Sequence, residues 1–304
     1  MSKALRNLLI IAGVLVIIGA IIAGTGFAMG GMRSISFSKD GPIVVGVDGK
    51  DMVEVNESYN KITALDVQMD LGELKLEEGD SFSLKGRYTF GLQSFEISES
   101  NGVLTVRAKQ TSRIGIGYIG VGTFHDQLTF TYPKGTKLDK VSIYLALGGL
   151  SIKNLDTDYL DVTLDAGAFN GNKVTTAQLI AQLNLGSCDI RQLSVSDSAK
   201  LNLDAGSLTL SNATVSNLSV DNHLGGVDFS GKLVDTADFN LDMGSISLKL
   251  DNRESDLSYN VSSNLGSVTI NGKSHGNSVI NTNTSSTCTL DVSLSLGSAD
   301  VKTR

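Results

Sequence analysis

The clearest feature of the sequence is an alternation of apolar and polar positions that repeats around a glycine. In the unit from Leu203 to Leu210, apolar residues stand three and one positions before Gly206, and two and four positions after it. This alternation has the two-residue period of a β-strand and not the 3.6-residue period of a helix. The phase of the alternation changes at the glycine. We therefore expect a bend there that keeps the apolar residues inside, and glycine permits such a bend.

The same unit occurs eight times between Leu145 and Val301, and once earlier, from Leu65 to Leu76. In the eight later copies the glycines are 19, 19, 20, 19, 19, 22 and 31 residues apart. Self-similarity at a period near 20 residues indicates a stack of identical units, none of which buries its apolar face alone. The predicted bend glycines are Gly72, Gly148, Gly167, Gly186, Gly206, Gly225, Gly244, Gly266 and Gly297.

The period also selects the architecture. A further apolar pair returns about twelve to fourteen residues after the first, as at Leu160 and Val162, and supplies another strand in each turn. Propeller blades need roughly 40 to 50 residues, and sandwich strands recur every 8 to 12 or so, which does not match. The sequence therefore predicts an all-β fold, a single-stranded parallel β-solenoid with about 20 residues per coil. We expect it to be right-handed, because parallel crossovers almost always are.

An uncharged apolar segment precedes the repeats. Residues 8–29 form 22 residues of this kind, long enough to span a hydrocarbon core of about 30 Å as a helix. Lys3 and Arg6 are expected to hold the N-terminus in the cytoplasm and to place the rest of the chain outside. The alternative is a cleaved signal peptide, for which Gly26-Phe-Ala28 is a candidate cleavage site.

These observations divide the chain into five parts. The part before the regular repeats contains a predicted hairpin, with Phe95 and Ile97 on one strand, a turn at Asn101-Gly102 and Leu104 on the second strand. A Ser-, Asn- and Thr-rich stretch lengthens the last repeat. We predict a cytoplasmic tail at 1–7, a transmembrane helix at 8–29, a linker at 30–56, irregular first coils with an N-terminal cap at 57–135, and regular repeats at 136–304 with a looped insertion at 271–287.

The glycine-centred units, the segment Phe130-Thr-Tyr-Pro-Lys-Gly-Thr-Lys-Leu138 and the terminal Leu294-Ser-Leu-Gly297-Ser-Ala-Asp-Val301 carry a family resemblance. Residues 57–304 resemble bacterial β-strand-repeat domains of unknown function that are often labelled "putative adhesin". The resemblance implies a membrane-tethered, surface-exposed β-solenoid of the bacterial cell envelope. Some relatives are linked to envelope-stress sensing. The family has no agreed catalytic motif, so the resemblance assigns no functional residue.

Several patterns that suggest chemistry have better structural explanations. Residues 57–304 contain 20 Lys and Arg against 28 Asp and Glu, so the basic stripe of a nucleic-acid binder is absent from the sequence. The segment Gly115–Gly120 matches G-x-G-x-x-G, but no helical pattern follows it, as a dinucleotide site requires. Cys188 stands at an inward position and is expected to be a small buried residue, and a disulfide with Cys288 is disfavoured. The scattered His and Cys residues indicate neither a metal nor another cofactor.

The most suggestive constellation is the outward column two positions before each glycine. Neighbouring coils lie about 4.8 Å apart, so second-neighbour carboxylates would be about 10 Å apart, near the separation in inverting glycosidases. The favoured interpretation is nevertheless a solvated polar ladder, because no Lys or Arg cluster accompanies the acids. Between two acids, the pKa of a histidine is expected to be raised. The candidate ladder is Asp165, Asn184, Asp204, His223, Asp242 and Asn264.

The function predicted from the sequence is a non-catalytic, adhesin-like binding or structural module, anchored in the cytoplasmic membrane by a single pass, with its C-terminal domain extracytoplasmic. The expected partner is an envelope protein or a wall component, and the solenoid ends offer a route to self-association. The alternatives are a regulatory ectodomain in envelope-stress sensing, which acts through a membrane partner, and a glycan-active β-helix enzyme.

Overall fold

The computed structural model describes residues 34–38, 41–45, 52–89, 94–109 and 126–304, which belong to two compact units. In the smaller unit, β1 (Ser34–Ser38) and β2 (Gly41–Val45) pair antiparallel. The segments 8–29 and 110–125, and with them the predicted transmembrane helix and the G-x-G-x-x-G match, lie outside the described residues. Within the described residues, no helix has the length and apolar character needed to span a membrane.

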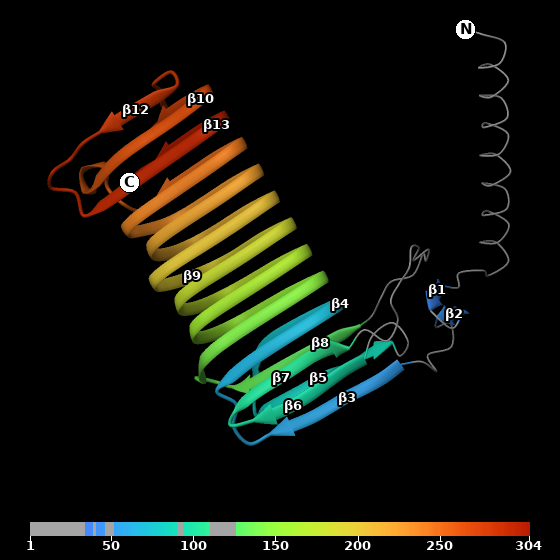
Figure 1. The fold of residues 1–304 in the computed structure, drawn as a ribbon. Coiled ribbons are helices and arrows are strands. Elements are labelled where there is room, and N and C mark those ends of the chain that lie inside the picture. Colours follow the sequence, from blue (N-terminus) through green and yellow to red (C-terminus); the bar gives the residue numbers. More distant parts are fainter. Residues whose placement is uncertain (1–33, 39–40, 46–51, 90–93, 110–125) are drawn as a thin grey trace, which may run out of the picture. The chain divides into compact units, whose positions relative to one another are not determined.

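The larger unit is a stack of β-coils (Figure 1). Its main element, β9 (Lys137–Leu250), is a continuous extended ribbon of 114 residues that runs through successive coils. Neighbouring coils are in register with one another at their glycines. A Cβ atom built on Gly167 would lie 1.7 Å from the carbonyl oxygen of Gly148, so the two backbones are in direct contact there. The all-β prediction is confirmed, and the fold is solenoid-like; the right-handed course stays a prediction.

A second bend, which occurs in five successive coils, was not predicted. Asn154, Lys173, Gln192 and Asn212 have positive φ angles between 53° and 58°, in the left-handed region that non-glycine residues rarely adopt. They recur at the period of the coils, and Gly231 occupies the next such place with a φ of 142°. The signal for this bend was present in the sequence as polar residues 19 or 20 positions apart. It is weak, because the residue types differ from coil to coil.

The core lies inside the coils, as the alternation predicts. Side chains three positions before the glycines and two and four positions after them are buried, as are the returning pairs such as Leu160 and Val162. Phe229 and Phe239 pack edge to face within it, with ring centroids 6.3 Å apart. Buried Thr157 and Thr176 donate hydrogen bonds from their hydroxyls to backbone carbonyls two residues further on, which satisfies polar groups at an inner corner.

One predicted inward column is wrong. The residue immediately before each glycine faces solvent, for example Leu147, Leu185 and Leu224. The physical reason is the position of the bend. The chain turns a corner at the glycine, so the two residues before the glycine both lie on the convex, outer side of the corner. The next buried residue stands two positions after the glycine, and the alternation resumes from there.

The N-terminal end of the stack is built around β4 (Ala64–Gly79), which pairs in parallel with the first coil of β9, with Gly72 opposite Gly148. The other edge of β4 pairs with β7 (Val103–Lys109) and β8 (Gln127–Pro133). The strand β6 (Ser94–Ser100) forms the predicted hairpin with β7, and this prediction is confirmed. Beyond β8 lie β5 (Phe82–Thr89) and β3 (Met52–Tyr59).

The order of coils at the C-terminal end differs from the order in the sequence. The strand β13 (Cys288–Lys302) lies between the last coil of β9 and β10 (Leu257–Ile270), and Gly297 is opposite both Gly244 and Gly266. The longer connection after β9, which contains the three-residue 3-10 helix η1 (Glu254–Asp256), allows β10 to pass over one position in the stack. The chain then covers the outer edge of β10 with β11 (Lys273–Ser274) and β12 (Ser278–Asn281), and returns to fill the vacant position.

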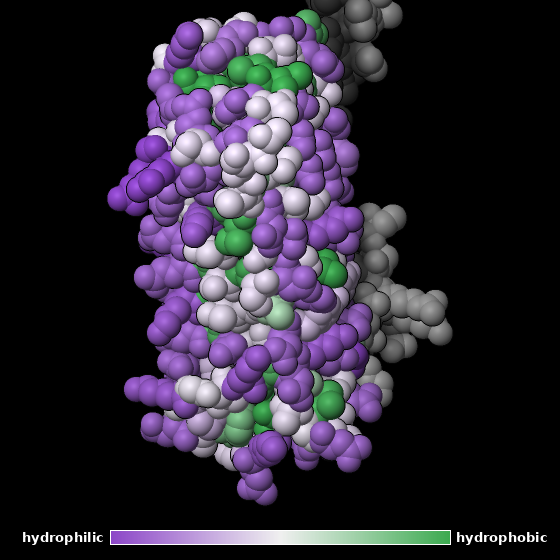
Figure 2. Space-filling view, turned by 90° about the vertical axis from the view of Figure 1, so that its left-hand side faces the viewer, coloured by the Kyte–Doolittle hydropathy of each residue, from purple (hydrophilic) through white to green (hydrophobic). Residues whose placement is uncertain are grey.

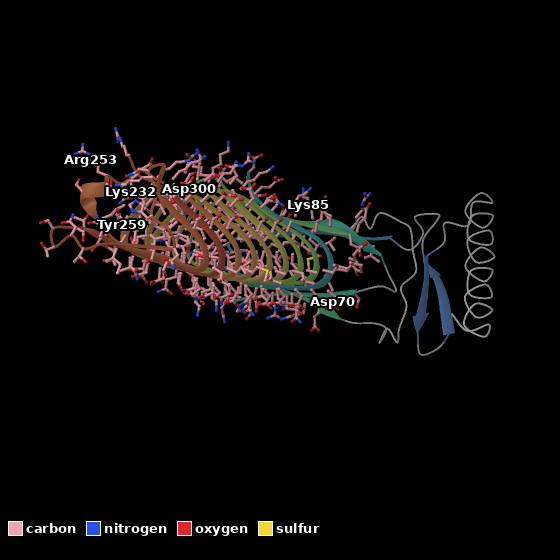
Figure 3. The ribbon with its side chains drawn as sticks, turned by 90° about the horizontal axis from the view of Figure 1, so that it is seen from above. Asp70, Lys85, Lys232, Arg253, Tyr259 and Asp300 are labelled. Carbon is pink, nitrogen blue, oxygen red and sulfur yellow. The ribbon has the colours of Figure 1, made fainter. Side chains whose placement is uncertain are left out.

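Seen along another direction, the side chains project outward from the walls of the stack (Figure 3). Asp70 on β4 and Arg253 next to η1 lie near opposite ends of the stack. The face shown in Figure 2 is mainly hydrophilic, with small hydrophobic areas between polar side chains. The stack therefore presents a rigid, largely polar wall on which any extended apolar surface would be an exception.

Candidate functional site

The predicted polar ladder lies on the outer surface, beside the glycine corner. In its first part the amide of Asn184 donates a hydrogen bond to Asp165 across one coil spacing, at 3.0 Å. The hydroxyl of Tyr144, on the preceding coil, donates to the other oxygen of Asp165 at 2.5 Å, and this hydrogen bond raises the pKa of Tyr144. These contacts make the first part of the ladder a hydrogen-bonded polar chain, with the oxygens of Asp165 already used by protein donors.

His223 forms the second contact of the ladder. Its Nδ1 atom lies 2.7 Å from Oδ2 of Asp242 on the next coil, and both side chains are exposed. The hydrogen bond to Asp242 raises the pKa of His223, and the charge of Asp204 on the preceding coil adds to the effect. This direction is the one expected from the sequence. Because the pair is exposed, solvent and salt screen it, and it is a local contact with little effect on stability.

The end of the ladder requires a correction. Asn264 does not lie next to Asp242, because β13 is inserted between the two coils. Ser295 on β13 occupies the intervening coil, and Asn264 lies on the outermost coil, β10. The six predicted residues therefore share one edge of the stack, but they do not form an unbroken series of neighbours.

The surface that sequence reasoning missed is the exposed column immediately before the glycines. We call it the glycine-edge row. Ala166 and Ala205 occupy its places on two coils, while the coils at its C-terminal end each carry a large side chain. The residue types gave no clear signal: this column mixes Leu, Met and Ala, and the buried column two positions after the glycines is as mixed, with Phe169, Cys188 and Ala299. The row consists of Leu147 (53% exposed), Leu185 (59%), Leu224 (50%), Met243 (50%), Leu296 (43%) and Leu265 (70%).

Four members of the row are consecutive neighbours. Leu224 and Met243 precede Gly225 and Gly244, whose backbones are in contact, and the register pairs Met243 with Leu296 and Leu296 with Leu265. The insertion of β13 sets the order of these side chains, with Leu296 between Met243 and Leu265. Monomeric proteins rarely expose contiguous apolar surface on an otherwise polar wall unless it binds something. The glycine-edge row is therefore the main candidate for a binding surface.

The surroundings of the row are acidic on one side. From the coil of Gly148 to that of Gly266, the columns two and four positions before the glycines contain no Lys or Arg. They contain Asp165, Asp204, Asp221 and Asp242, and one ionisable base, His223, which is hydrogen-bonded to Asp242. On the other side, from Gly148 onward, the position after the glycine is Gly, Ala or Ser. Beyond it, Asp189 pairs with Arg191 at 3.6 Å and Asp300 pairs with Lys302 at 3.0 Å. Negative charge thus follows the ladder side of the row.

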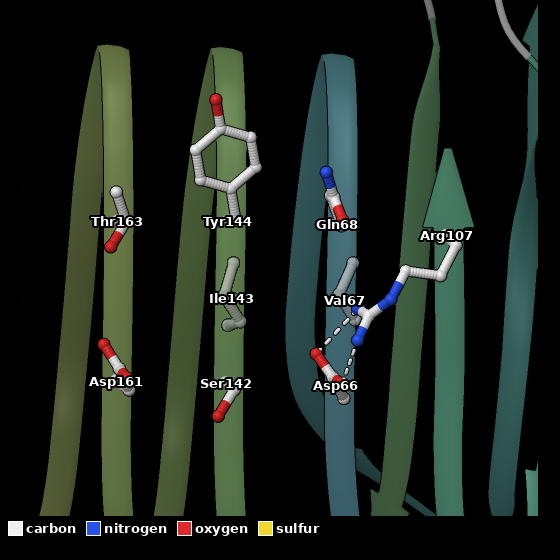
Figure 4. Close-up of a pocket in the computed structure, with 9 residues that line it drawn as sticks. All are labelled: Asp66, Val67, Gln68, Arg107, Ser142, Ile143, Tyr144, Asp161 and Thr163. Carbon is white, nitrogen blue, oxygen red and sulfur yellow. Dashed lines mark hydrogen bonds and ion pairs between the residues drawn. The ribbon is translucent and has the colours of Figure 1, made fainter. Parts of the chain in front are cut away.

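A separate polar pocket lies on the outer face of β4, β7 and the first coils of β9 (Figure 4). Its volume is about 300 Å³, and Asp66, Gln68, Ser142, Asp161 and Thr163 contribute to its lining. Arg107 on β7 lies at one side of it and forms a two-pronged ion pair with Asp66 on the neighbouring strand β4, as the dashed lines in Figure 4 show. The pocket offers hydrogen-bonding groups, but its one positive side chain is already occupied by a carboxylate of the protein.

The cysteines do not form reactive groups in this structure. Cys188 and Cys288 are buried free thiols, and Cys188 occupies the inward position expected from the sequence. Burial raises the pKa of Cys188, and it raises the pKa of Cys288 to about 11, so both are protonated at neutral pH. Among the residues that the structure describes, no group of three or more His, Cys, Asp or Glu side chains is arranged to hold a metal ion.

Comparison with known families gives a match that covers the whole stack. The Toastrack DUF4097 model matches residues 62–302. The chain belongs to the Toastrack DUF4097 family. The match spans β4 to β13 and so includes the glycine-edge row, the ladder and the pocket. The resemblance to β-strand-repeat domains of unknown function that was based on the repeats is thereby confirmed.

Solved structures add similarities at low identity. A "putative adhesin" from Bacteroides fragilis is 12% identical, with 84% of this chain and 98% of that chain covered and a TM-score of 0.46. A "putative cell adhesion protein" from Clostridium sporogenes is 11% identical, with 83% and 99% covered and a TM-score of 0.28. A "putative lipid binding protein" from Parabacteroides distasonis is 11% identical, with 83% and 97% covered and a TM-score of 0.29. No curated protein matches the chain. Similarities at this level say nothing about the ligand of this protein.

Proposed function

We propose that this Toastrack protein is a non-catalytic binding module of the bacterial cell envelope. A helix over 8–29 would anchor it in the cytoplasmic membrane, with the tail 1–7 inside and the β-stack outside, where the stack would bind an envelope protein or a wall component. The alternative of a regulatory ectodomain that acts through a membrane partner stays a prediction.

The observation that carries the proposal is the glycine-edge row. The stack holds its backbone rigidly through continuous parallel pairing and close glycine contacts, so the row is presented in a fixed geometry. Leu224, Met243, Leu296 and Leu265 expose large apolar surfaces to water without any folding role inside the coils. Burying such side chains against a partner yields free energy of about 25 cal/mol per Å² of apolar surface removed from water. A rigid apolar row on a polar wall is therefore suited to binding.

The binding part of the proposal is tested by site-specific photo-crosslinking in intact cells. A photoreactive phenylalanine derivative is placed at Leu185, Leu224 or Met243, one position per strain. We expect a discrete higher-mass adduct from these positions. Ile280 on β12 is the matched control, because it is a large apolar residue that is 71% exposed and lies off the row. If the row positions give no adduct, or the same adducts as Ile280, the proposal fails.

The anchoring part is tested by protease treatment of intact, wall-stripped cells. We expect the protease to remove the stack and to leave a small membrane-associated stub that contains 1–29. A full-length chain that is protected from the protease would contradict the proposed orientation. A chain that is found mainly in the medium would indicate cleavage after Ala28 instead of anchoring.

A further inference from the structure

We propose that the glycine-edge row receives an amphipathic α-helix of a partner protein, and that this helix carries Lys or Arg residues along one flank of its apolar face. The inference rests on the proposed function, and it specifies the chemistry of the partner. It follows from the length of the row, the repeat along it and the charge beside it.

The row has the length and repeat of a helix that lies along the stack. From the coil of Leu147 to the coil of Leu265 there are seven coil steps, or about 34 Å, which corresponds to about 22 helical residues. One coil spacing of about 4.8 Å is close to the 5.4 Å pitch of an α-helix. The two repeats differ by about 0.6 Å per step, so successive turns of a helix stay opposite successive coils over the four consecutive coils from Leu224 to Leu265. Apolar residues at intervals of three and four positions then face the row.

The two sides of the row differ in a way that orients such a helix. On one side, the position after each glycine is Gly, Ala or Ser, as at Gly226, Ser245 and Ser298, so a helix can approach the backbone closely there. On the other side lie the carboxylates of Asp165, Asp204, Asp221 and Asp242, in columns that contain no Lys or Arg from the coil of Gly148 to that of Gly266. The one ionisable base in these columns is His223, so four carboxylates stand against a single imidazole. A Lys or Arg flank of the helix would complement these carboxylates.

The same charge pattern disfavours two other occupants. A second copy that docked through the same edge with its row antiparallel would bring its own Asp204 and Asp242 columns towards those of the first copy, and like charges at an interface cost free energy. With parallel rows, the acidic columns of each copy would face the Gly, Ala and Ser positions of the other, which offer them no opposite charge. An anionic lipid surface would meet the same carboxylates and would be repelled. A basic amphipathic helix satisfies both the apolar row and the acidic columns.

The test measures binding of a synthetic, fluorescently labelled helical peptide of about 22 residues to the purified full-length chain. The probe has a leucine face flanked by lysines. One control peptide carries glutamate in place of lysine, and a second has the same composition but a shuffled order that destroys the apolar face. The proteins compared are the wild type, the triple variant Leu224→Ser, Met243→Ser and Leu296→Ser, and the variant Ile280→Ser. All of these side chains are exposed, so folding is retained, and circular dichroism verifies this for each chain.

We expect the wild type and Ile280→Ser to bind the lysine peptide equally, and the triple variant to bind it at least tenfold more weakly. We also expect the glutamate and shuffled peptides to bind at least tenfold more weakly than the lysine peptide, and added salt to weaken binding of the lysine peptide. Equal binding of the lysine and glutamate peptides, or unchanged binding by the triple variant, would overturn the inference.

Four further outcomes separate this inference from the proposed function. Binding of the wild type to vesicles of anionic phospholipid, lost in the triple variant, would assign the row to a lipid surface. A concentration-dependent dimer of the wild type, abolished in the triple variant, would assign it to a second copy. If crosslinking from Leu224 in cells succeeds while the lysine peptide fails to bind, the binding function stands and the helix is wrong. If crosslinking fails as well, both are wrong.

Discussion

At the scale of single residues, the distance from a glycine decides the environment of a side chain. Leu183 and Leu185 are two positions apart and chemically identical, yet the first is 1% exposed and the second is 59% exposed. Strand alternation alone assigns both to the same face. The glycine corner that follows them separates the two, because Leu185 lies on its convex side. This is why the sequence predicted most inward columns correctly but assigned the column of Leu185 to the interior.

The glycine corner makes a sharp prediction for two adjacent glycines. Gly148 has a φ of 150°, and a Cβ atom built there would lie 1.8 Å from the carbonyl oxygen of Gly72. Gly149 has ordinary space, since its Cβ would be 3.8 Å from the side chain of Glu73. We expect Gly148→Ala to reduce the free energy of unfolding by about 3 kcal/mol, and Gly149→Ala to change it by less than about 1 kcal/mol. Thermal or denaturant unfolding of the two variants measures the difference, and similar values for both would contradict the backbone contact between coils.

His223 provides the prediction for pH. Its hydrogen bond to Asp242 and the charge of Asp204 raise its pKa in the folded protein. The resulting stabilisation is fully present below the unfolded pKa of about 6.5, and it is lost as the pH rises through the raised folded value. NMR titration should therefore give His223 a pKa above that of a free histidine. Asp242→Asn should lower it more than Asp204→Asn does, because only Asp242 forms the hydrogen bond. A pKa insensitive to both changes would show that these residues are not on neighbouring coils.

At the scale of the elements, each coil behaves as an exchangeable unit, since it contacts chiefly the coils on either side of it. Removing residues 167–185 joins Ala166 to Gly186 and takes out one complete coil, so that Gly186 stacks on Gly148 and every inward column stays in phase. Removing 167–175 instead shifts the register and turns apolar side chains outward. We expect the first deletion to melt cooperatively near the wild-type temperature and the second to be unfolded or strongly destabilised, as followed by circular dichroism. Comparable melting of the two would contradict the stack.

Other elements were accessible from the sequence to different degrees. The hairpin of β6 and β7 was predicted because Asn101-Gly102 is a strong local turn signal. The position of β13 was not predicted, because it depends on which edge of the stack is free when residues 271–304 fold. Both orders satisfy the same alternation and the same glycines. The lengthened spacings before Gly266 and Gly297 indicated a departure from the regular repeat, but not its form.

At the scale of the whole stack, the insertion of β13 determines the order of the side chains in the candidate binding surface. It places Leu296 between Met243 and Leu265, so that Leu265 lies on the outermost coil of the row. It also explains why Asn264 does not lie next to Asp242. Family membership and the course of the coils were visible in the repeat, but the order of the last residues in the row is known only from the order of the coils.

The central claim, that the exposed side chains form a continuous row in the order Met243, Leu296, Leu265, is tested most directly by cysteine pairs. Cys188 and Cys288 are replaced by alanine, and pairs of cysteines are introduced at two of the three row positions in separate chains. Paired residues on adjacent strands are about 4.8 Å apart, within the range for a disulfide, whereas residues two strands apart are about 10 Å apart and beyond it. Under mild oxidation, Met243→Cys with Leu296→Cys and Leu296→Cys with Leu265→Cys should form intramolecular disulfides, and Met243→Cys with Leu265→Cys should not. A disulfide between positions 243 and 265, with none between 243 and 296, would show that the coils stack in chain order and would contradict the account.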